Sequence, residues 1–131
     1  MDATFAFAVE HDNRLIRSWL TGFFTMDSFE RYVAERRATF QRLSCAPGET
    51  FSIVDITDMK IQAQDLVVPF AAMMADPRFR SRRVAFVVGS SLARMQLRRA
   101  LGERAGHDAR AFDDEASARR WVLTGQDALA A

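Results

Sequence analysis

Few side chains in this sequence have the type and spacing that catalysis requires. The two histidines, His11 and His107, lie far apart in predicted turns, so we interpret both as surface residues. Cys45 is the only cysteine, and its position between a predicted helix and Pro47 favours an incidental thiol over a nucleophile. A nucleophile needs a base beside a hydroxyl or thiol, and no segment supplies that pair. We therefore expect no catalytic residues, no metal ligands and no cofactor.

Three polar residues, Asp55, Thr57 and Asp58, follow a short apolar segment that is typical of a buried strand. Carboxylates in this position can bind Mg²⁺, but capping of the following helix is the commoner use of such side chains. We interpret the three residues as capping groups that also contribute to a binding surface.

The segment Gly89-Ser90-Ser91 connects a second apolar strand to a predicted helix that carries Arg94. Free N–H groups and the helix dipole favour anions at such a helix start, and the carboxyl ends of parallel strands often hold ligands. The segment lacks the glycine and lysine pattern of phosphate and dinucleotide loops, so a serine N-cap is the simpler interpretation. Gly89, Ser90, Ser91 and Arg94 are candidate binding residues.

Basic residues are concentrated in one stretch of the chain. The net charge is only +1, but residues 78–104 contain eight arginines and a single acidic residue, Glu103. No aromatic residues alternate with these arginines as nucleic-acid stacking would require. We expect an acidic protein partner, or self-association with the acidic remainder of the chain, in preference to nucleic acid.

The composition is that of one ordinary globular domain. The chain has 131 residues, of which 49% are hydrophobic and 27% charged, and this balance argues against disorder. No apolar run is long enough to span a membrane, and the first residues do not resemble a secretory signal. With a single cysteine, these features indicate a cytoplasmic protein.

Hydrophobic periodicity predicts five strands and four helices in the order β-β-α-β-α-β-α-β-α. The predicted strands span residues 3–9, 14–22, 51–56, 84–88 and 109–112. The predicted helices span residues 25–43, 62 or 67 to 75, 92–101 and 114 to about 124. Strands that alternate with helices require a mainly parallel sheet, here with one antiparallel strand at its N-terminal end. We expect a single α/β domain over residues 1–125 and a flexible tail over residues 126–131.

Three details of the helices stay open at this stage. Thr25 or Asp27 can cap the first helix, and Asp27 with Glu30 has capping-box form. Arg36 lies near the middle of that helix's apolar stripe. An arginine in this position usually packs its aliphatic stem and extends its guanidinium into water; in the alternative interpretation, the guanidinium points into a pocket. Pro69 requires either a short second helix from about residue 67 or a kinked one from residue 62. Asp113 is the expected cap of the last helix.

Several segments taken together resemble small bacterial STAS-like proteins, relatives of the SpoIIAA-type anti-sigma-factor antagonists. The segments are Leu20-Thr-Gly-Phe-Phe-Thr25, Ile53-Val-Asp-Ile-Thr57, Arg83-Val-Ala-Phe-Val-Val-Gly-Ser-Ser-Leu-Ala-Arg94 and Phe112-Asp-Asp-Glu-Ala-Ser-Ala-Arg-Arg-Trp121. The resemblance covers about residues 4–123 and rests on the order of the elements. It implies a SpoIIAA-like fold and a non-enzymatic domain that binds another protein.

In signalling members of that family a serine at the start of the helix after the middle strand is phosphorylated. The corresponding stretch here, Asp55–Asp65, contains no serine, and its one hydroxyl, Thr57, comes too early. We therefore expect a regulatory protein-interaction domain without the usual phosphoacceptor, and with itself as a candidate partner in a homodimer. Its expected contact surface joins residues 55–65 to residues 90–98. The alternative is a carrier of a small anionic or lipidic ligand bound at the carboxyl ends of the strands.

Overall fold

Residues 2–126, which the computed structural model describes, form five strands and four α-helices in the predicted order. The strands are β1 (Thr4–Glu10), β2 (Leu15–Thr21), β3 (Phe51–Asp55), β4 (Arg83–Val87) and β5 (Ala109–Phe112). The α-helices are α1 (Met26–Leu43), α2 (Gln64–Ala75), α3 (Ser91–Leu101) and α4 (Glu115–Thr124). Apart from Gln126, the expected tail lies outside the described residues.

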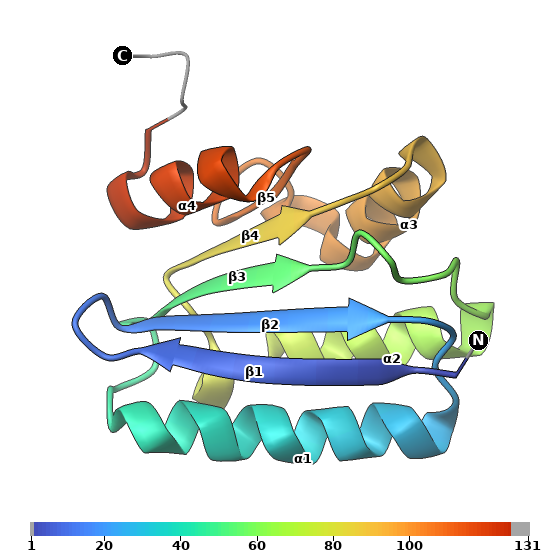
Figure 1. Ribbon diagram of the computed structural model, residues 1–131, viewed down its shortest axis with the longest axis horizontal. Helices are drawn as coiled ribbons and strands as arrows, with labels where there is room; N and C mark the ends of the chain where they lie inside the picture. The colour runs from blue at the N-terminus through green and yellow to red at the C-terminus, as the bar shows by residue number, and fades with distance from the viewer. Residues whose placement is uncertain (1, 127–131) are drawn as a thin grey trace.

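The strands form one mixed sheet whose spatial order follows the chain, β1-β2-β3-β4-β5 (Figure 1). β1 pairs antiparallel with β2, and β2 to β5 are parallel to one another. The predicted α/β class and the predicted N-terminal hairpin are therefore confirmed. The carboxyl ends of the four parallel strands lie at one edge of the sheet (Figure 1).

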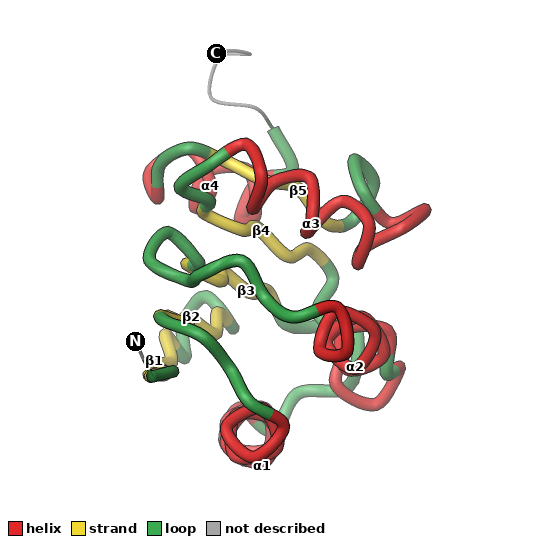
Figure 2. Tube along the Cα trace, turned by 90° about the vertical axis from the view of Figure 1, so that its right-hand side faces the viewer, coloured by secondary structure: helices red, strands yellow, loops and turns green. Residues whose placement is uncertain are grey.

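Helices α1, α2 and α3 cover one face of the sheet, and α4 covers the other (Figure 2). Each of the first three connects one parallel strand to the next strand along the sheet. Because such crossovers are right-handed and here always advance in the same direction, all three helices lie on the same face. α4 follows the last strand, makes no crossover, and packs on the opposite face.

Each face of the sheet has its own apolar core, because successive side chains of a strand point to opposite faces. The core under α4 consists of Leu15, Ile53, Ala85, Val87, Ala118, Trp121 and Val122. The cores under α1, α2 and α3 consist of Leu20, Phe24, Phe29, Tyr32, Leu66, Phe86, Val88, Leu97, Leu101 and Ala109. Ala85 and Ala118 are fully buried and lack bulk, which lets α4 approach the sheet closely.

At α1 the structure decides between the two predicted caps, and at α4 it corrects the predicted cap. α1 is capped by Thr25, whose hydroxyl accepts a hydrogen bond from the Ser28 N–H, and Ser28 completes the capping box. The predicted Asp27–Glu30 box is therefore wrong, because the helix already begins at Met26. α4 is capped by Asp114, which accepts from the Ser117 N–H at 2.8 Å, and not by Asp113.

Helix α2 begins at Gln64, between the two predicted starts, and keeps Pro69 in its second turn. Proline at this position leaves the carbonyl of Asp65 without its helical donor. Asp65 lies in the exposed first turn, where water can supply that hydrogen bond. The helix ends before Asp76, as predicted. Within residues 2–126, none of the helices has the length and apolar character needed to cross a bilayer.

Candidate functional site

The loops that follow β3 and β4 lie side by side, as the sequence predicted. The backbone N–H of Ile56 donates to the Val87 carbonyl at 2.9 Å. Gly89, in the loop after β4, packs against Thr57 in the loop after β3. A Cβ at position 89 would lie 2.6 Å from the Thr57 carbonyl oxygen. Asp55 accepts a hydrogen bond from the Thr57 N–H at 2.9 Å, which fixes the turn after β3. Only a glycine permits this close contact between the two loops.

The other predicted binding residues are occupied by local contacts. Ser90 caps α3 by accepting from the Ala93 N–H at 3.1 Å, as the simpler interpretation held, and Ser91 is exposed beside it. Arg94 extends toward the end of β5, where it donates to Asp113 at 2.7 Å.

Asp58 is exposed, and its backbone carbonyl accepts from the Gly22 N–H at 3.0 Å. The structure therefore joins Asp55, Thr57 and Gly89, whereas the charge of Arg94 pairs with Asp113. Among residues 2–126, no three His, Cys, Asp or Glu side chains gather closely enough to hold a metal ion.

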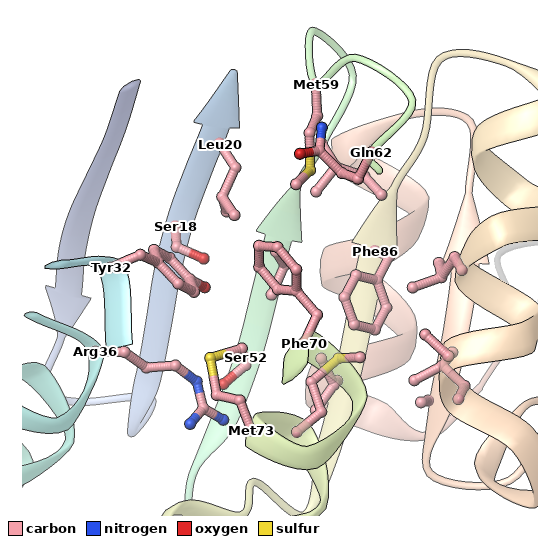
Figure 3. A pocket seen from close by; sticks show the side chains of 18 of the residues that line it. Ser18, Leu20, Tyr32, Arg36, Ser52, Met59, Gln62, Phe70, Met73 and Phe86 are labelled. Atoms are coloured by element: carbon pink, nitrogen blue, oxygen red, sulfur yellow. The ribbon is translucent and has the colours of Figure 1, made fainter. Parts of the chain in front are cut away.

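A cavity of about 110 Å³ lies between the sheet and helices α1, α2 and α3. It runs along the strands from Met59, beyond the carboxyl end of β3, to Ser52, near the amino end of that strand. Its wall is mostly apolar: Leu20, Phe70, Met73 and Phe86 point into it from β2, α2 and β4 (Figure 3). The strand residues reach it because their alternate side chains face the three helices.

One end of the cavity carries a cluster of polar side chains, which we call the Arg36 cluster. Its members, contributed by β2, α1, β3 and the segment before β4, are Ser18, Tyr32, Arg36, Ser52 and Ser81. Ser52 and Ser81 are buried, and their hydroxyl oxygens lie 2.6 Å apart. Figure 3 shows the Arg36 guanidinium directed into the cavity, between Ser52 and Met73.

The Arg36 guanidinium is held by weak neutral contacts. It donates to the Phe79 carbonyl at 3.1 Å and lies 4.9 Å from the centre of the Phe40 ring. In the part of the chain that the structure describes, no carboxylate forms an ion pair with it. Burial lowers the pKa of Arg36 and raises that of Tyr32, because both groups lose water around their charged forms. Arg36 is half-buried and its guanidinium lines the cavity, which agrees with the alternative interpretation of an arginine directed into a pocket.

The opposite end of the cavity is closed by two glutamines whose hydrogen bonds are satisfied within the protein. The Gln62 side chain accepts from the Phe24 N–H at 2.9 Å and donates to the Gly22 carbonyl at 3.1 Å. Gln96 accepts from the Gln62 N–H at 3.1 Å and donates to the Gln62 carbonyl at 2.9 Å. These bonds join the loop after β3 to the start of α1 and to α3.

The sequence interpretation missed Ser18, Ser52, Ser81 and Tyr32. A signal was present for two of them, since Ser18 alternates with Ile16 and Leu20 along β2, and Ser52 alternates with Val54 along β3. Buried hydroxyls on the face of a sheet are expected to have polar partners, so each indicates a polar site under the helices. Ser81 and Tyr32 carry no such signal, because their places depend on how the helices and the loop before β4 pack.

No protein-family model matches the chain, and a search of curated proteins finds no match either. Among solved structures, an uncharacterised protein of the DUF3478 family from Shewanella loihica PV-4, described as having a SpoIIAA-like fold, is similar with a TM-score of 0.70. The two sequences are 14% identical, and the match covers 92% of this chain and 94% of that one. The chain thus has a SpoIIAA-like fold, as the resemblance implied. At this identity the similarity shows the fold alone.

Proposed function

We propose that this protein is a non-enzymatic binding protein that holds a small, largely apolar molecule between the sheet and helices α1 to α3. The observation that carries the proposal is the apolar cavity with the Arg36 cluster at one end. The ligand alternative from the sequence placed the molecule at the carboxyl ends of the strands. The cavity instead extends from those ends along the strands and beneath the helices.

The energetics of packing support this proposal. Protein interiors are normally packed as densely as organic crystals, so an apolar space of about 110 Å³ leaves the side chains around it without the contacts that a packed core provides. A molecule that fills the void restores those contacts and stabilises the folded state. An apolar cavity of about 150 Å³ in another protein binds benzene, so a ligand with an apolar part of that order fits here.

A large side chain introduced into the wall of the cavity should weaken ligand binding. Ala100 lines the cavity from α3, whereas Ala72 is exposed on α2. We expect Ala100→Phe to lower the affinity of delipidated protein for a fluorescent apolar probe at least tenfold, and Ala72→Phe to leave it unchanged. Native mass spectrometry of freshly purified wild-type protein should show an additional bound mass that Ala100→Phe lacks.

Equal probe affinity in the two variants would contradict the proposed function. Circular dichroism of both variants is the control for folding, because the larger side chain is inserted beside a packed core. If Ala100→Phe unfolds, Val67→Leu replaces it, because Val67 also lines the cavity. The smaller added volume should lower probe affinity by less than Ala100→Phe would.

A second candidate function is a protein-interaction domain, and exposed apolar side chains on the predicted contact surface favour it. Ile61, Leu92 and Met95 are 46%, 65% and 55% exposed, and they lie within residues 55–65 and 90–98. Apolar side chains that gather on a surface mark contacts with other proteins more often than scattered ones do. The partner is another protein or a second copy of this chain.

Weakening this surface should release the partner. We expect Leu92→Ser to lower recovery of a bound protein from lysate, or to shift a dimer to monomer in sedimentation velocity. Val68→Ser is the matched control, because Val68 is 67% exposed on α2, outside the surface. Unchanged association in Leu92→Ser, or an equal loss in both variants, would count against the surface.

A further inference from the structure

Three basic side chains line the cavity, and they differ in what they bind. Lys60 is exposed. Arg104 is bonded to Asp108 at 3.1 Å and to the Met74 carbonyl at 2.6 Å. Arg36 has one hydrogen bond, to a backbone carbonyl, and pairs with no carboxylate of residues 2–126. Its planar fork presents five N–H groups, so most of its donors remain for a ligand.

The hydroxyls around Arg36 complete a receptor for an oxygen-rich group. Ser52 and Ser81 lie within hydrogen-bond distance of each other, and Thr50 lies 3.1 Å from Ser81. Hydroxyls rotate to donate or accept as a neighbour requires. At the other end, the side-chain bonds of Gln62 and Gln96 are already made within the protein. The polar part of a ligand therefore belongs at Arg36.

Building on the proposed function, we propose that the ligand is a monocarboxylate with an aliphatic or aromatic tail. Its carboxylate pairs with the Arg36 guanidinium, beside the hydroxyl of Ser52. Its tail lies along Phe70, Met73 and Phe86, toward the end closed by Gln62 (Figure 3).

Charge balance selects a carboxylate over other head groups. Arg36 is half-buried and forms no ion pair with a carboxylate of residues 2–126, and an anion bound to its fork in bidentate geometry would supply the missing partner. A neutral head would leave the charge of Arg36 uncompensated. A phosphate dianion would bring a second negative charge, whereas Arg104, the other arginine in the wall, already pairs with Asp108. One carboxylate matches the single charge of Arg36.

The size of the cavity selects a short tail. Its volume of about 110 Å³ is somewhat below that of a cavity that takes benzene, which indicates a tail of about five or six carbons. Met59, Met73 and Met74 line it, and their flexible side chains can adapt to a straight or a ring-shaped tail. Hexanoate is the simplest probe with these properties.

The experiment compares hexanoate with 1-hexanol by NMR titration of the delipidated full chain. We expect wild-type protein to bind hexanoate at least tenfold more tightly than 1-hexanol. Arg36→Met keeps the length of the side chain and removes its charge, so it should lose that preference and bind 1-hexanol at least as well as wild type. Arg31→Met is the matched control, because Arg31 is exposed on the same helix and forms an ion pair with Asp27 at 3.4 Å, away from the cavity.

The possible results separate this inference from the proposed function. Equal affinity of wild type for both probes, or a preference for hexanoate that survives in Arg36→Met, overturns the inference and leaves an apolar site in place. Binding of neither probe to wild type overturns both. Arg36→Met should melt no lower than wild type, because it removes a half-buried charge that forms no ion pair with a carboxylate of residues 2–126. Should it not fold, the wild-type comparison still decides.

Discussion

Replacement of Trp121 by alanine is expected to lower the free energy of unfolding by about 3–5 kcal/mol, the range for removing a large aromatic side chain from a core. Trp121 is 2% exposed at the centre of the core between α4 and the sheet. Its ring lies 5.6 Å from the Phe112 ring, and the Arg110 guanidinium lies 5.1 Å from its centre. Denaturant unfolding followed by circular dichroism measures the change.

The position of Trp121 also makes it a test of the two-faced architecture. Trp121 belongs to α4, which lies on the face of the sheet opposite α1, α2 and α3 (Figure 2). Since the cavity lies under those three helices, probe affinity in Trp121→Ala should equal that of wild type at a temperature where both are folded. The exposed neighbour Arg120 is the control, and Arg120→Ala should change stability by less than about 0.5 kcal/mol. A loss below 1 kcal/mol for Trp121→Ala would contradict the packing of α4.

Replacement of Gln62 by alanine is expected to cost about 2–4 kcal/mol, the sum of one or two unsatisfied buried polar groups and a lost side chain. Gln62 is 8% exposed and reaches three backbone groups, the Phe24 N–H and the carbonyls of Gly22 and Lys60. Alanine leaves the Phe24 N–H, next to a fully buried ring, without its acceptor. Thermal and denaturant unfolding measure this effect.

The same change should loosen the end of the cavity that Gln62 closes, so we also expect a several-fold weaker affinity for the apolar probe. Gln64→Ala is the control, because Gln64 is exposed at the first residue of α2, and its stability should stay within about 0.5 kcal/mol of wild type. If Gln62→Ala matches Gln64→Ala in stability, the hydrogen bonds of Gln62 do not hold the loop after β3.

Most of the fold is predictable from the sequence because periodicity and connection length determine it. The residues of β2 and β4 alternate or form apolar runs, and the helices between parallel strands leave one handedness of crossover. The errors occur where two side chains compete for one role. Thr25 and Asp27 both suit a cap of α1, and Asp113 and Asp114 both suit a cap of α4, so only the actual hydrogen bonds decide.

The candidate site is less predictable because it depends on side chains far apart in the chain. The sequence predicts the contact between the loops after β3 and β4, which follows from strand order alone. The sequence also places Arg36 within an apolar helical stripe, but it does not show where the guanidinium points. Ser52 and Ser81 meet because the segment before β4 runs beside the amino end of β3, where the Arg82 N–H donates to the Thr50 carbonyl at 2.7 Å. The cavity itself is a property of how α1, α2 and α3 are spaced, and no local pattern encodes that.

The most direct measurement of the central claim is intermolecular nuclear Overhauser spectroscopy with hexanoate bound to the full chain. A ligand held between the sheet and the helices, with its carboxylate at Arg36, will show contacts from its terminal methyl group to the Phe86 ring and to the Met59 methyl group, which lies at the Gln62 end of the cavity. Contacts confined to the exposed side chains of Leu92 and Met95 would contradict the account, because they would place the molecule on the outer surface of α3.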